Sequence, residues 1–116
     1  MQQEGIEQLG FGGWSFGGAV AIQAGVIAAA RTVVTFATQG YGAEVVGQLP
    51  EDSSVLLIHG DRDQTLTPYN SELVYKLAHE PKELFIFKGA GHGLDEASEE
   101  VRHLCLEWIN SSLPLP

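Results

Sequence analysis

The segment Gly13-Trp14-Ser15-Phe16-Gly17 holds the residues best suited to covalent chemistry. It matches the pattern G-x-S-x-G and lies where an expected strand passes into an expected helix. The turn in that setting is so tight that the residues two before and two after the serine must be small, and the hydroxyl is pushed out over the sheet edge. Ser15 is therefore the candidate nucleophile, and the backbone N–H of Phe16 is the candidate donor to an oxyanion.

A serine hydroxyl is a poor nucleophile unless a base takes its proton and an acid orients that base. Asp63 and His92 follow Ser15 in the order that the motif predicts, each in a loop directly after an apolar segment. Asp61 is the rival acid, and its position is more typical of a solvated turn residue. The carboxyl ends of neighbouring parallel strands meet at one edge of a sheet, so we expect Ser15, Asp63 and His92 to converge there.

Other side chains near these loops permit more than one interpretation. Trp14 flanks the serine and is a candidate for binding substrate, although packing in the core explains it equally well. His59 ends an apolar segment, which is more typical of a histidine that satisfies local hydrogen bonds. No pair of histidines has the spacing of metal ligands, and the glycines do not follow the phosphate-binding patterns, so the sequence predicts no metal and no cofactor.

The elements that must position these loops alternate along the chain. Apolar and β-branched runs predict strands. A long run that is apolar nearly all round, over 17–30, and two runs with periodic apolar positions predict helices. Consecutive apolar positions within the strands indicate a sheet covered on both faces. Strands are expected over 6–11, 32–37, 55–58 and 83–87. Helices are expected over 17–30, from a cap at Asn70 or Ser71 to just before Pro81, and from a cap at Asp95 onward. The fold class is therefore α/β, with a parallel sheet of about four strands.

Three ordered motifs resemble those of one known family. Gly13-Trp14-Ser15-Phe16-Gly17-Gly18, His59-Gly60-x-x-Asp63 and Gly91-His92-Gly93 are similar to the nucleophile elbow, acid loop and histidine loop of the α/β-hydrolase superfamily. The short stretch between the strands at 32–37 and 55–58 leaves no room for a cap, as in the small esterase and dienelactone-hydrolase-like branch. The resemblance implies a single domain over 1–116 that corresponds to the C-terminal half of that fold.

The same resemblance implies an activity and a role for each motif residue. It makes Ser15 the nucleophile, Asp63 the orienting acid and His92 the base of a serine hydrolase that cleaves small carboxylic esters or thioesters. A catalytically silent domain that acts as an assembly module is the alternative.

The elements expected upstream of the elbow in that family have no counterpart in this sequence. Right-handed crossovers between sequential strands place their helices on one face, which leaves only the last helix to cover the other. The first strand would also present an open edge, and an open edge favours pairing with another strand. We therefore expect self-association, as a two-fold homodimer whose first strands pair or whose bare faces pack together. The alternative is that the chain is a fragment or one part of a split protein.

Composition limits the partners. The chain has 116 residues and a formal net charge of −9, and no cluster of Lys and Arg interrupts that charge. Phosphate backbones and anionic lipid surfaces would repel it, so nucleic-acid and membrane-surface partners are disfavoured. Met1 begins a polar, acidic segment without the features of a signal peptide, and Cys105 is the single cysteine, so a cytoplasmic protein is expected.

Overall fold

Four parallel strands form the sheet of the computed structural model, which describes residues 9–113. The strands are β1 (Gly10–Trp14), β2 (Thr32–Phe36), β3 (Ser54–Gly60) and β4 (Lys82–Phe87). They lie side by side in the order of the chain. The predicted α/β class with a four-stranded parallel sheet is confirmed.

The first strand is not where the apolar pattern placed it. The expected strand over 6–11 lies mostly outside the described residues, and the observed strand runs from Gly10 to Trp14, pairing in register with Thr32 to Phe36. Glycine is a poor strand former, so propensity disfavours the sequence Gly-Phe-Gly-Gly-Trp. Pairing with the β-branched strand β2 outweighs that preference.

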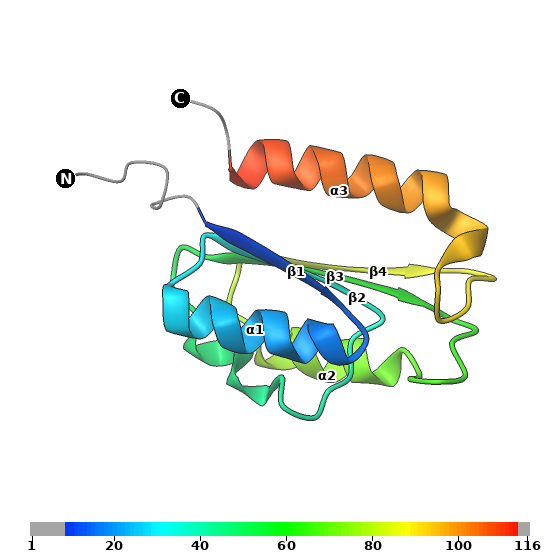
Figure 1. The fold of residues 1–116 in the computed structure, drawn as a ribbon, viewed down its shortest axis with the longest axis horizontal. Helices are drawn as coiled ribbons and strands as arrows, with labels where there is room; N and C mark the ends of the chain where they lie inside the picture. The colour runs from blue at the N-terminus through cyan, green and yellow to red at the C-terminus, as the bar shows by residue number, and fades with distance from the viewer. Residues whose placement is uncertain (1–8, 114–116) are drawn as a thin grey trace.

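The helices divide between the two faces as right-handed crossovers require. Helix α1 (Phe16–Ala28), the 3₁₀ segment η2 (Glu44–Gln48) and helix α2 (Tyr69–Leu77) cover one face, and helix α3 (Ser98–Ser112) covers the other (Figure 1). Each face has its own buried cluster. Ile22, Val33, Val46, Leu57 and Val74 belong to the first, and Val34, Leu56, Ile58, Leu94 and Val101 to the second.

Two predicted helix caps are wrong. No side chain caps α2, which begins after Pro68, because Asn70 accepts a hydrogen bond from the N–H of Gly40 and Ser71 bonds to His59. Asp95 starts the short 3₁₀ turn η3 (Asp95–Ala97) instead, and α3 begins only at Ser98. At α2, contacts with residues distant in the sequence replace the expected cap. At α3, a preceding 3₁₀ turn takes the place of the expected cap.

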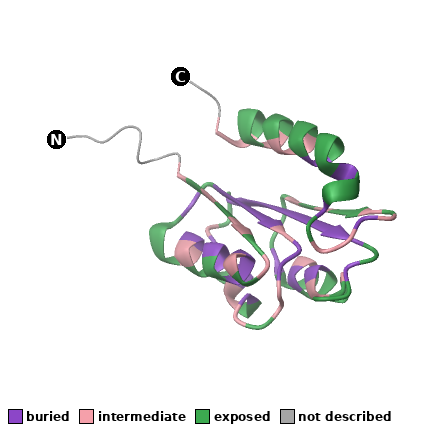
Figure 2. Ribbon diagram, turned by 45° about the vertical axis from the view of Figure 1, so that its right-hand side comes forward, coloured by how far each residue is buried: buried purple, intermediate pink, exposed green. Residues whose placement is uncertain are grey.

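Burial is uneven across the sheet. Every residue of β3 is buried, whereas β1 and β4 alternate between exposed and half-buried positions, as the colours of Figure 2 show. No helix within residues 9–113 combines the length and apolar character needed to cross a bilayer.

Candidate active site

Ser15 lies alone between β1 and α1, in a strained backbone conformation. Its φ of 58° and ψ of −122° lie in a region that L-residues rarely adopt, and such a conformation costs about 1–3 kcal/mol. Three backbone hydrogen bonds hold the turn. The N–H of Ser15 donates to the carbonyl of Phe36 at 2.8 Å, and the carbonyl of Ser15 accepts from the N–H groups of Gly18 at 2.9 Å and Gln39 at 3.3 Å.

The glycines around Ser15 are not equivalent. A Cβ added to Gly13 would lie 1.9 Å from the carbonyl oxygen of Gly17, and one added to Gly18 would lie 2.3 Å from Oγ1 of Thr38. A Cβ on Gly17 would meet nothing within 4 Å outside its own helix backbone. The expectation that both motif glycines must be small therefore holds for Gly13 and is wrong for Gly17. The close approach falls on Gly18 instead, because this residue lies against Thr38.

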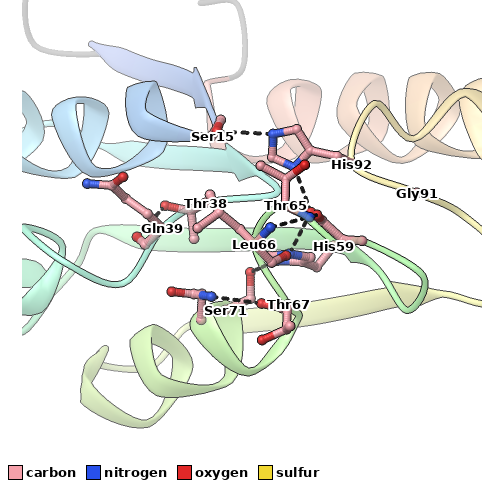
Figure 3. A network of polar contacts seen from close by, with 12 residues as sticks. Ser15, Thr38, Gln39, His59, Thr65, Leu66, Thr67, Ser71, Gly91 and His92 are labelled. Atoms are coloured by element: carbon pink, nitrogen blue, oxygen red, sulfur yellow. Dashed lines mark hydrogen bonds and ion pairs between the residues drawn. The ribbon is translucent and has the colours of Figure 1, made fainter.

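The imidazole of His92 lies between Ser15 and Asp63. Its Nε2 is 3.1 Å from Oγ of Ser15, and its Nδ1 is 2.7 Å from Oδ2 of Asp63. Figure 3 shows the His92 ring turned toward Ser15. An ionised carboxylate only accepts, so Nδ1 carries a proton, and in the neutral ring Nε2 accepts the Ser15 hydroxyl proton. The structure thus brings together all three side chains that the motifs single out.

Asp63 is buried in the loop after β3, with its charge well satisfied. Its Oδ1 accepts the N–H groups of Thr65 at 2.9 Å and Leu66 at 2.8 Å, while Oδ2 accepts His92. Burial alone would raise the pKa of Asp63, but the hydrogen bonds from His92, Leu66 and Thr65 outweigh it, so the pKa lies below its ordinary value. The carboxylate is therefore ionised at neutral pH.

Two other acidic side chains hold the loop that carries His92. Asp61 is exposed, and its Oδ1 accepts the N–H of Gly89 at 2.7 Å. Glu96 accepts the N–H of Gly91 at 3.0 Å, and this hydrogen bond lowers the pKa of its carboxyl. The sequence did not indicate either contact. The first joins two loops that are far apart in the chain, and the second lies within a turn whose shape depends on the fold.

The two aromatic residues beside Ser15 lie differently. Trp14 stacks on Phe36, with ring centroids 4.8 Å apart and planes 15° apart, and its indole N–H donates to the carbonyl of His92 at 3.3 Å. Phe16 is the first residue of α1, and 66% of its surface is exposed. Backbone N–H groups in the first turn of a helix lack an acceptor within the helix, so the N–H of Phe16 takes no part in the hydrogen bonds of α1.

The remaining histidines also differ in their surroundings. His79 and His103 are exposed on the surface. His59 is buried at the end of β3, where it bonds to Ser71 and the carbonyl of Leu66, in agreement with the expected local role. Its Nε2 also lies 3.1 Å from Oδ2 of Asp63, a contact that the sequence analysis missed. The spacing of four residues between His59 and Asp63 was the available signal.

Comparisons by sequence find no match, whereas comparison with solved structures finds similar folds. No protein-family model matches the chain. No curated protein matches it either. A dienelactone hydrolase from Anabaena variabilis matches with a TM-score of 0.81 and 24% identity over 91% of this chain and 50% of its own. An α/β serine hydrolase without a lid, from Xanthomonas campestris, matches with a TM-score of 0.78 and 20% identity over 94% and 50%.

A third solved structure gives the same result. The esterase domain of a Rhodothermus marinus protein matches with a TM-score of 0.73 and 18% identity, over 90% of this chain and 60% of that one. The chain therefore spans about half to three fifths of the length of these three structures. The four strands and three helices within residues 9–113 match part of the fold of these hydrolase structures.

Proposed function

We propose that the protein is a serine hydrolase that cleaves small carboxylic esters or thioesters through an acyl-enzyme. The observation that carries the proposal is the continuous contact from Ser15 through His92 to Asp63, with 3.1 Å between Oγ and Nε2 and 2.7 Å between Nδ1 and Oδ2. These separations are within the reach that a nucleophile, its base and the orienting acid require. The hydrolase fold of the structural neighbours supports the same conclusion.

Acylation would begin with proton transfer from Ser15 to Nε2 of His92. Oγ then bonds to the carbonyl carbon of the ester, and the carbonyl π electrons move onto oxygen, which accepts the N–H of Phe16. When the tetrahedral intermediate collapses, the bond to the alkoxide or thiolate breaks, and the His92 imidazolium protonates that leaving group. The acyl group remains on Ser15.

Deacylation would repeat these steps with water in place of the serine. His92 takes a proton from water, the hydroxide attacks the acyl carbon, and Ser15 leaves with the proton returned by His92. Asp63 stays ionised throughout, holds the Nδ1–H tautomer and stabilises the imidazolium. Its lowered pKa and buried position suit this role.

The surroundings of Ser15 favour small or protruding substrates. Trp14 and Phe16, the chain neighbours of Ser15, are 42% and 66% exposed, so the opening beside the serine is flanked by two partly solvent-exposed aromatic residues. We assign Trp14 to the substrate side of this opening, where its stacking on Phe36 fixes the indole plane. No cofactor takes part in this mechanism.

A fluorophosphonate probe tests the proposal directly. The probe phosphonylates a serine only where a base activates it, so we expect labelling of the wild type at Ser15, located by peptide mass mapping, and none of Ser15→Ala. Ser111→Ala, which removes an exposed serine of α3, is the matched control and should label like the wild type. Absence of labelling at every pH between about 6 and 9 would contradict the proposal.

The second candidate is an assembly module, and the open side of the sheet favours it. Strand β1 is an edge strand, and residues 10–30 carry no charged side chain in a chain of net charge −9. Phe16, Val20 and Ile27 of α1 are exposed apolar side chains in this segment. Two copies could meet there without opposing their acidic surfaces, so the homodimer stays our prediction and is compatible with either function.

A further inference from the structure

Behind Asp63, two buried side chains form a polar contact that the proposed reaction does not use. His59 of β3 and Ser71 of α2 are both fully buried. Nδ1 of His59 is 2.6 Å from Oγ of Ser71, and Nε2 is 2.7 Å from the carbonyl oxygen of Leu66. The same Nε2 lies 3.1 Å from Oδ2 of Asp63. Figure 3 shows His59 and Ser71 within this network.

The partners of His59 define its protonation. A carbonyl oxygen only accepts hydrogen bonds, so Nε2, which faces Leu66, must carry a proton. In the neutral ring Nδ1 is then an acceptor, and the Ser71 hydroxyl donates to it. The neutral Nε2–H ring satisfies both hydrogen bonds of the buried imidazole.

In this tautomer the protonated Nε2 of His59 donates to the carbonyl of Leu66 and also lies beside the carboxylate of Asp63. The oxygen that accepts His92 Nδ1–H is therefore 3.1 Å from a second ring nitrogen, Nε2 of His59. The other oxygen is held by the N–H groups of Thr65 and Leu66. Rotation of the carboxylate would break contacts on both oxygens, so the network restricts Asp63 to the orientation in which Oδ2 faces His92.

We propose that His59, held in its tautomer by the carbonyl of Leu66 and in its place by Ser71, is a positioning residue that fixes Oδ2 of Asp63 toward His92. Its kinetic consequence rests on the proposed hydrolase function, whereas the tautomer and the contact with Asp63 do not. His59 touches neither the substrate nor Ser15. It acts on the reaction only through the carboxylate.

Three variants separate positioning from packing. His59→Leu keeps much of the volume and removes both ring nitrogens, and a misplacement passed on to His92 lowers the rate by up to about 100-fold. His59→Gln supplies an amide N–H near the position of Nε2 and should recover most of the loss. Ser71→Ala should give a smaller loss, because Nε2–H remains. The expected fall is in kcat with KM unchanged, and His103→Gln, an exposed site on α3, is the control.

Nuclear magnetic resonance tests the network without relying on activity. Imidazole nitrogen shifts of the full chain should show His59 as the neutral Nε2–H tautomer, and carboxyl carbon shifts should show a higher Asp63 pKa in His59→Leu than in wild type. A neutral Nδ1–H tautomer would overturn the proposal, as would an unchanged Asp63 titration together with wild-type kcat in folded His59→Leu. If His59→Leu does not fold, the Asp63 titration and kcat of Ser71→Ala test the proposal in its place. A wild type that hydrolyses no ester contradicts the proposed function alone, because the tautomer and titration are still measurable.

Discussion

The two sides of the candidate site differ in what holds them: the acid side, around Asp63, is buried and densely hydrogen-bonded, whereas the nucleophile side, around Ser15, lies at the sheet edge. Asp63 follows β3, a central strand in which every residue is buried, and its carboxylate has three hydrogen bonds and a fourth polar contact. Ser15 follows β1, an edge strand with three glycines, and it depends on a strained turn beside the exposed ring of Phe16.

The difference shows how the fold divides the work of the site. The buried side fixes the orientation of the carboxylate and, through it, of His92, which requires dense hydrogen bonding away from water. The edge side leaves Ser15 half-buried rather than enclosed, and its geometry depends on backbone conformation and close glycine contacts. Substitutions on the acid side should therefore lower mainly the catalytic rate, whereas substitutions on the nucleophile side should change mainly stability or association.

The largest expected effect comes from the acid side. Asp63→Asn keeps the shape of the side chain but removes the charge and favours the wrong tautomer of His92, so ester hydrolysis should fall by roughly 10⁴-fold in kcat. Steady-state kinetics with a small activated ester measure the change, and circular dichroism verifies the fold. A loss below about tenfold would mean that Asp63 does not orient His92.

A matched pair of glycine variants tests the nucleophile side. In Gly13→Ala the new Cβ would lie 1.9 Å from the carbonyl oxygen of Gly17, so we expect destabilisation of about 3 kcal/mol. Gly17→Ala meets open space within a helix, where alanine gains up to about 1 kcal/mol over glycine. Urea unfolding measures both free energies, and equal destabilisation by the two variants would show that the tight contact at Gly13 is absent.

Acid should remove the stabilisation that Asp63 provides. Its pKa is lower in the folded state than in the unfolded chain, so the ionised carboxylate stabilises the native state above about pH 4 and loses that contribution as the pH falls through the folded-state pKa. Asp63→Asn lacks this contribution at every pH. The free energies of unfolding of the two proteins, measured by urea between about pH 3 and 7, should therefore converge in acid. A gap that widens in acid would contradict the lowered pKa.

The predicted homodimer concerns the open edge rather than the acid side. Ile27 is 87% exposed on α1, so Ile27→Glu should weaken association about tenfold or more by burying a charge at the contact. Sedimentation velocity measures the change, and Leu77→Glu, a half-exposed position of α2, is the control. A wild type that stays monomeric at micromolar concentration would exclude the dimer.

The smallest expected effect is at the junction of the two sides. Trp14→Phe keeps an aromatic ring on Phe36 and removes the N–H that donates to the carbonyl of His92. Losing one partly exposed hydrogen bond should lower kcat about threefold. A loss as large as that of Asp63→Asn would show that the indole, rather than the carboxylate, positions the His92 loop.

The residues of the site could be named from the sequence because their signals are local. G-x-S-x-G marks a strand-to-helix turn, and a glycine-flanked histidine or an aspartate after an apolar run marks a strand end. The contact between His59 and Asp63 had only its four-residue spacing as a signal, and the hydrogen bonds of the His92 loop to Asp61 and Glu96 had none. Those contacts depend on which loops the sheet brings together.

In the fold too, the elements that depend on local sequence patterns were predicted, whereas those that depend on contacts distant in the sequence were not. Strands β2 to β4 and the sides on which the helices pack follow from apolar runs and crossover handedness. The position of β1 was missed because its glycines hide the strand signal. The predicted caps at Asn70 or Ser71 and at Asp95 were wrong, because Asn70 bonds to Gly40 and Ser71 to His59, and because the 3₁₀ turn at Asp95–Ala97 intervenes before α3.

Trapping of the acyl-enzyme tests the central claim most directly. The full chain is mixed with p-nitrophenyl acetate, quenched in acid within the first turnover and mapped by mass spectrometry, with Ser15→Ala treated in parallel. The account predicts one acetyl group on Ser15 and a burst of p-nitrophenol that Ser15→Ala lacks. Hydrolysis at the same rate in Ser15→Ala, or a wild type with no acetyl group on Ser15, would contradict it.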